Sequence, residues 1–96
     1  MREIEFSHSY LKDLRLARKR NLPEDELNIV IKKLANDEIL EPKYLDHSLK
    51  GKYAVFRECH ICPDWLLVYR KEDSLKGNKP LNIFYLARTG THSDLF

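Results

Sequence analysis

The sequence has little of several features that would assign it to particular classes of protein. Its two cysteines, Cys59 and Cys62, are too few and too close together to cross-link a small secreted scaffold, which points to a reducing compartment. No apolar run approaches the roughly 20 residues of a membrane span, and the N-terminal stretch lacks the apolar region of a secretory signal. We therefore expect a cytoplasmic protein that does not enter the membrane.

An excess of one charge is also missing. The 17 Lys and Arg residues nearly balance 15 Asp and Glu, so the net charge of +2 does not by itself indicate nucleic-acid binding. Basic residues nevertheless cluster in "KDLRLARKR" (12–20) and in "KYLDHSLKGKYAVFR" (43–57). Such clusters can contact phosphates, although a solvated helix face also explains the first one. At 96 residues the chain is expected to form one domain, 1–96.

The N-terminal third predicts a short strand followed by two helices. "EIEF" (3–6) alternates charged and apolar residues as a half-exposed strand does. Ser7 or Ser9 can cap a first helix that ends near Asn21, and Pro23 suits the start of a second helix. Apolar residues recur in that second helix at i, i+3, i+4 and i+7, namely Leu27, Val30, Ile31 and Leu34. The two amphipathic helices should form an antiparallel hairpin on a flat partner.

The remaining sequence predicts that partner as a meander of three strands. Residues 52–61, 65–70 and 81–88 are rich in aromatic and β-branched side chains, and turn signals separate them at 62–64 and 71–80. We read the second separator as a long flexible turn. The fold class is then α+β, with the elements in the order β-α-α-β-β-β along the chain. The strands form a small antiparallel-type sheet, which has the helical hairpin on one face and is partly open on the other.

A metal site and an acid–base site both need consideration. "ECHICPD" contains a Cys-x-x-Cys, but in a strand Cys59 and Cys62 point to opposite faces, and only a break before Cys62 could bring them together. We therefore expect buried or half-buried thiols and no metal site. Histidine is the side chain best suited to moving protons near neutral pH. His47, His60, Asp64 and His92 border the meander together with Arg88, which could stabilise negative charge.

Three segments carry a resemblance to a known family: "DHSLKG", "FRECHICPDWLLVYR" and "ARTGTHSDLF". In this order they resemble the signature of the YafQ branch of the RelE/ParE toxin superfamily, whose fold has the same β-α-α-β-β-β order. The resemblance implies the toxin of a type II toxin–antitoxin system, a monomer that is silenced by a cognate antitoxin. It implies an endoribonuclease that cleaves mRNA in the ribosomal A site without a metal or cofactor.

The resemblance also implies residue roles. His92 matches the general acid, and His47 and Asp64 are both candidates for the base that activates the ribose 2′-hydroxyl. His60 would orient or share a proton, and Arg88 would contact the scissile phosphate. A last set of residues would bind substrate or ribosomal RNA, namely Trp65, Phe96, Lys50 and Lys52.

Two of these expectations have structural alternatives. Trp65 could belong to the core, and Phe96 could hold the tail against the sheet. We further expect Gly90 to permit a tight turn that brings His92 back over the open face.

Two other functions compete with the ribosome-dependent nuclease. Related toxins of the ParE type inhibit a protein target without cleaving RNA, but such a protein has no need of this set of histidines. A free ribonuclease acting without ribosomes would use the same residues, and cleavage of naked RNA would distinguish it.

Overall fold

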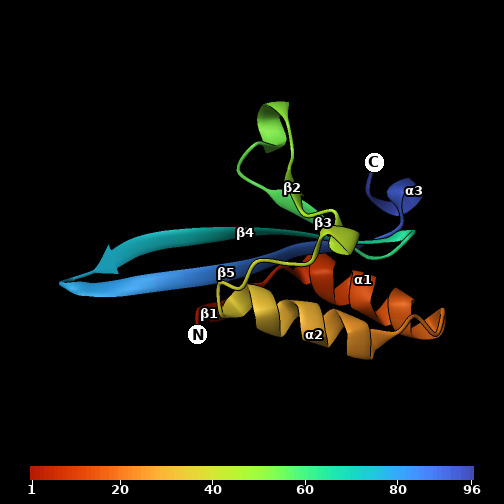
Figure 1. Ribbon diagram of the computed structural model, residues 1–96, viewed down its shortest axis with the longest axis horizontal. Coiled ribbons are helices and arrows are strands. Elements are labelled where there is room, and N and C mark those ends of the chain that lie inside the picture. The colour runs from red at the N-terminus through yellow and green to blue at the C-terminus, as the bar shows by residue number, and fades with distance from the viewer.

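The computed structural model describes residues 1–96, arranged as two helices on one face of a twisted sheet (Figure 1). The elements are β1 (Glu3–Phe6), α1 (His8–Lys19), α2 (Glu24–Ala35), the 3-10 turn η1 (Pro42–Tyr44), β2 (His47–Ser48), the 3-10 turn η2 (Gly51–Tyr53), β3 (Arg57–Cys62), β4 (Trp65–Lys76), β5 (Lys79–Gly90) and α3 (His92–Leu95).

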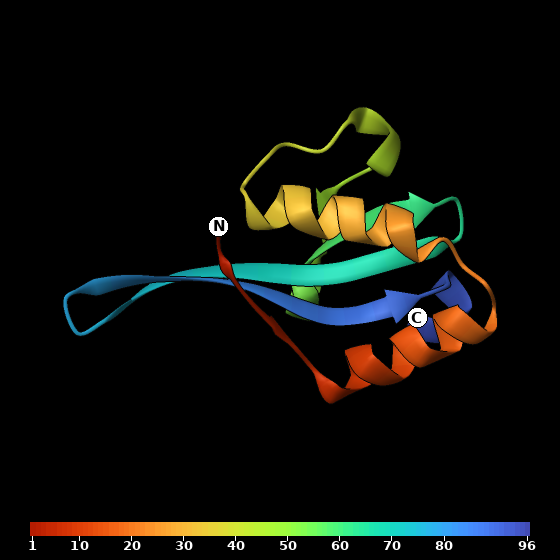
Figure 2. The same ribbon diagram turned by 90° about the horizontal axis from the view of Figure 1, so that it is seen from below.

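The helical hairpin forms as its sequence predicts. Ser7 caps α1, and its hydroxyl oxygen accepts a hydrogen bond from the Tyr10 backbone N–H at 2.9 Å. In α2 the spaced apolar residues Leu27, Val30 and Leu34 are all buried. Both helices lie on the same side of the sheet, where their apolar faces and the sheet together form the core (Figure 2).

The sheet has five strands in the order β1-β5-β4-β3-β2. The predicted meander of β3, β4 and β5 is confirmed as antiparallel. β1 adds to β5 in parallel, so the sheet is mixed and not purely antiparallel. The predicted strand over 52–61 begins only at Arg57, because residues 52–53 belong to η2 and a turn follows them. No pattern in the sequence indicated the two-residue strand β2.

The stretch 71–80 is not a loop, so our expectation there was wrong. β4 and β5 continue as a paired ribbon until only Gly77 and Asn78 separate them. Gly77 has φ +65°, a conformation that glycine adopts without steric penalty. The ribbon extends away from the helices, and its tip lies at the opposite end of the sheet from α3 (Figure 1).

Both thiols are free, one buried and one half-buried, as the sequence predicts. Cys59 is fully buried in the core, and burial raises its pKa to about 12. Cys62 is half-buried and packs against the same core, so our expectation that the two cysteines point to opposite faces was wrong. A register shift between His60 and Cys62 interrupts the alternation of side chains in β3. None of the three α-helices is both long and apolar enough to cross a membrane.

Candidate active site

Strand pairing places one row of side chains across the face of the sheet that the helix pair does not cover. His47 in β2 pairs with Glu58 in β3, Glu58 with Val68 in β4, and Val68 with Arg88 in β5. Residues directly opposite one another on antiparallel strands point to the same face. Residues 47 and 88 are therefore brought to one surface by the register of four strands.

The next row adds two further histidines to this surface. His60 pairs with Leu66, and Leu66 pairs with Gly90, two residues before His92. The ring centroids of His60 and His92 lie 5.7 Å apart, and those of His47 and His60 lie 6.4 Å apart. The three histidines predicted from the sequence thus form one cluster.

Glu58 lies within this cluster, and the sequence analysis missed it. Its carboxylate oxygen Oε1 is 3.6 Å from His60 Nε2 and 3.8 Å from His47 Nε2, and its side chain is only 7% exposed. A buried carboxylate needs a compensating partner, and the two imidazoles provide it when protonated. The signal was present in the sequence, since Glu58 and His60 are two positions apart on one strand and so share a face.

The backbone fixes the protonated nitrogen of His47. Its Nδ1 lies 2.6 Å from the carbonyl oxygen of Leu45, which can only accept a hydrogen bond. Nδ1 therefore carries a proton, and the neutral ring has its lone pair on Nε2. Leu45 itself has φ +49°, a left-handed conformation that is uncommon for a leucine. This strained residue directs its carbonyl at the histidine.

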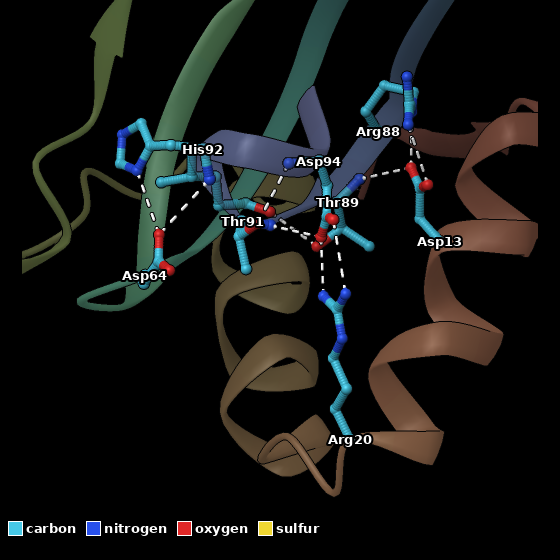
Figure 3. A network of polar contacts seen from close by, with 9 residues as sticks. Asp13, Arg20, Asp64, Arg88, Thr89, Thr91, His92 and Asp94 are labelled. Atoms are coloured by element: carbon cyan, nitrogen blue, oxygen red, sulfur yellow. Dashed lines mark hydrogen bonds and ion pairs between the residues drawn. The ribbon is translucent and has the colours of Figure 1, made fainter. Parts of the chain in front are cut away.

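His92 is held in the same way by Asp64, in the turn between β3 and β4 (Figure 3). Asp64 Oδ1 is 3.2 Å from His92 Nδ1 and accepts a weaker bond from the His92 backbone N–H at 3.4 Å. The carboxylate accepts, so Nδ1 donates and Nε2 remains free. Asp64 and His92 are 69% and 56% exposed, which leaves Nε2 accessible to a substrate.

A second network fixes the short helix α3, on which His92 lies (Figure 3). Thr91 and Asp94 form a capping box, each side chain accepting from the other residue's backbone N–H. Asp94 also forms a 2.7 Å ion pair with Arg20 at the end of α1. The Arg20 guanidinium, followed by the Thr91 backbone bond, lowers the pKa of Asp94 to about 2.

Gly90 is needed at the end of β5 for space and not for a special turn. Its φ is not positive, contrary to our expectation of a tight turn there. A Cβ at this position would lie 3.0 Å from the Asp94 Cβ and 3.1 Å from its Oδ2. The missing side chain therefore lets α3 pack closely on the strand.

Arg88 is held by Asp13 of α1 (Figure 3). Asp13 accepts from Arg88 Nε at 2.7 Å and Nη2 at 3.1 Å, and from the backbone N–H of Thr89 at 3.1 Å. Hydrogen bonding to Asp13 raises the pKa of Arg88. Two of the five guanidinium donors are engaged, which leaves the others free for an anion. Asp13 is a second residue that sequence patterns did not reveal.

The residues predicted to bind substrate differ in their exposure to solvent. Trp65 is 1% exposed and belongs to the core, so it does not present a surface on which a base could stack. Phe96 is 65% exposed, and Lys50 and Lys52 are exposed as well. Of the basic helix cluster, Arg18 is paired with Glu24 and Arg20 with Asp94.

One set of side chains could hold a metal ion. Glu58, His60 and His92 each offer a ligand atom, and these atoms lie within 4.8 Å of one another. Two imidazoles and one carboxylate are typical ligands of zinc and related transition metals. The cysteines that we examined first for metal binding are not part of this set.

Comparisons with known proteins agree on one family. A family model described as "Bacterial toxin of type II toxin-antitoxin system, YafQ" matches residues 2–96. The mRNA interferase toxin YafQ of Escherichia coli strain K12 is 38% identical over 96 residues, covering 99% of this chain and 96% of that protein. The crystal structure of a copper-bound mutant toxin from Helicobacter pylori is 38% identical, with a TM-score of 0.84 and full coverage of both chains. The E. coli DinJ-YafQ toxin-antitoxin complex matches with a TM-score of 0.82 and 36% identity, covering 99% of this chain and 97% of that chain.

Proposed function

The chain belongs to the YafQ family of bacterial toxins of type II toxin–antitoxin systems, and we propose that it cleaves mRNA in the ribosomal A site with its histidine cluster. Membership makes it an endoribonuclease, an mRNA interferase. A cognate antitoxin is its partner, as in the DinJ-YafQ complex. We also propose that cleavage depends on the ribosome, that the protein contacts ribosomal RNA and that it lies in the cytoplasm, because its substrate would be a translated message. Without its antitoxin the protein would be a monomer.

His47 is the proposed general base. The ribose 2′-hydroxyl must lose a proton to attack the adjacent phosphate, and the neutral His47 ring has its lone pair on Nε2 because Leu45 holds the proton at Nδ1. Glu58, 3.8 Å from that nitrogen, would stabilise the imidazolium formed when Nε2 takes the proton. This arrangement favours His47 over Asp64, whose carboxylate already faces His92.

His92 is the proposed general acid. In its protonated form it donates from Nε2 to the leaving 5′-oxygen while Asp64 holds Nδ1. His60 lies between the other two rings and would share or orient a proton. Such a base and acid each supply roughly 10²- to 10⁴-fold in rate.

Arg88 would stabilise the extra negative charge that develops on the phosphate. Asp13 fixes the guanidinium through Nε and Nη2, so the free Nη1 donors are presented in a defined direction. The reaction proposed here needs only these side chains, because attack, proton removal and proton donation are all provided.

A divalent metal ion would act on this cluster as an inhibitor. Glu58, His60 and His92 fit such an ion by their ligand types and close spacing. Bound there, the ion would supply Lewis acidity. It would occupy the imidazole lone pairs of His60 and His92 and so keep both residues from transferring protons.

The observation that carries the proposal is the convergence of His47, His60 and His92 around the buried Glu58. We would measure single-turnover cleavage of an mRNA bound to purified ribosomes by the wild type, His47→Gln and His92→Gln. Either substitution should slow cleavage by roughly 10²- to 10⁴-fold. His8→Gln is the matched control, since His8 is exposed at the start of α1. Equal cleavage of the same RNA without ribosomes would contradict ribosome dependence.

A further inference from the structure

A second hollow lies on the same face of the sheet and shares Arg88 with the proposed active site. This apolar slot, with a volume of about 190 Å³, has Val68, Ala87 and Arg88 among its lining residues. Val68 and Arg88 are members of the row that also contains His47 and Glu58. A ligand in the slot would therefore lie beside the phosphate that Arg88 is proposed to contact.

Two separate segments line the slot together with the strands. Leu49, Tyr53 and Phe56 come from the connection around η2, and Leu95 and Phe96 come from the chain end. Gly51 begins η2 with φ +65°, so the backbone turns there in a way that other residues resist. Tyr53 is 47% exposed and Phe96 is 65% exposed, so both aromatic side chains remain accessible to a ligand.

The chemistry of the slot fits a flat apolar group attached to an anion. No acidic residue lines it, and its only charged lining residue is Arg88. Lys52 adds a second cation, with its Nζ 5.2 Å from the centroid of the Tyr53 ring, and Lys50 is exposed just before η2. An apolar cavity of this size with cations at its side matches one nucleobase of RNA with its phosphates, because bases stack on aromatic rings and phosphates seek Lys and Arg.

We propose that the apolar slot binds the nucleobase next to the scissile phosphate, with Tyr53 as the residue on which that base stacks. The proposal rests on the function proposed above and adds a binding site to it. A base held by Tyr53 at one end and a phosphate held by Arg88 at the other would fix the register of the RNA over the histidine cluster. Stacking tolerates every base, so the slot would position the message more than it selects a sequence.

The test measures binding in a background that cannot cleave. Ribosomes programmed with an mRNA that carries 2-aminopurine in the A-site codon are titrated with His92→Gln protein, and quenching of the fluorophore reports stacking. Tyr53→Ala should weaken binding roughly 5- to 150-fold, the range typical of losing one base–aromatic stack, and abolish the added quenching. Tyr53→Phe should keep both. Val55→Ala is the control, because Val55 is 71% exposed two residues further along and does not line the slot.

A second variant, Phe96→Ala, and a second ligand, the antitoxin, keep the result interpretable. Phe96→Ala removes the aromatic residue at the chain end and should also weaken binding, while thermal unfolding shows whether either variant is still folded. Unchanged RNA affinity and quenching in Tyr53→Ala would overturn the proposal. Loss of antitoxin affinity with RNA affinity intact would also overturn it and would assign the slot to the antitoxin. Because no cleavage is needed, failure of the acid–base mechanism would be seen separately, as cleavage that survives His92→Gln.

Discussion

Replacing Asp13 should uncouple Arg88 from the helix that holds it. Asp13 accepts two hydrogen bonds from Arg88 and one from the backbone N–H of Thr89, a residue that is 1% exposed. In Asp13→Ala that N–H loses its acceptor, which costs about 1–3 kcal/mol for a buried group. The Arg88 side chain is 40% exposed, so loss of its ion pair adds at most about 1 kcal/mol. We expect the free energy of unfolding to fall by about 1–4 kcal/mol.

The same change should slow cleavage, because a guanidinium that is free to move no longer meets the phosphate in a fixed geometry. A displacement of about 1 Å can lower a rate by about 10²-fold, so a loss of tenfold or more is expected. Asp13→Asn separates the two effects. Its amide oxygen can still accept from Thr89, so stability should be largely kept while the charge that fixes Arg88 is lost.

Urea unfolding and single-turnover cleavage on ribosomes measure the two effects. Glu38→Gln is a suitable control, because Glu38 is an exposed acid without an ion pair. If Asp13→Ala unfolds and cleaves like the wild type, the argument that this contact positions Arg88 is refuted.

Three further predictions concern the Asp94–Arg20 ion pair on α3, the candidate metal ligands and the core tryptophan. The pKa of Asp94 is depressed to about 2, so the stabilisation that its ion pair gives α3 is complete above pH 4 and is lost as the pH falls toward 2. The NMR signals of the His92 ring should report this loss, and Arg20→Ala should abolish the low-pH change in them. Zn²⁺ should bind with a calorimetric signal and inhibit cleavage, a chelator should restore activity, and Glu58→Gln should weaken the binding; an unaltered affinity in that variant would exclude this site. Trp65→Ala should destabilise the fold by about 3–5 kcal/mol, and a stable variant with weakened RNA binding would show that Trp65 contacts the substrate.

The sequence predicted the fold where hydrophobic periodicity is strong. Leu27, Val30 and Leu34 define the buried side of α2, and the run from Trp65 to Tyr69 defines a strand buried on both faces. The outer half of the β4–β5 ribbon was missed because its residues are mostly exposed and polar, so no alternation of burial marks it. Cross-strand hydrogen bonds hold this ribbon, and they leave no trace in composition.

The candidate site could be predicted from the sequence only in part. His47, His60 and His92 were found by residue type and by resemblance, and the register brings them together. Asp13 and Arg20 act through contacts with Arg88 and Asp94, which are distant in the sequence, and such pairings depend on the tertiary fold. Glu58 shares a face of β3 with His60, so the two-residue spacing could have revealed it.

Primer extension on a translated reporter mRNA tests the central claim most directly. The protein is induced briefly in bacteria, and the wild type is compared with His92→Gln and His8→Gln, alongside the same RNA without a start codon. The proposed mechanism predicts cuts at codon positions that require translation, persist in His8→Gln and disappear in His92→Gln. Cuts that survive His92→Gln, or growth arrest without cuts in the wild type, would contradict it.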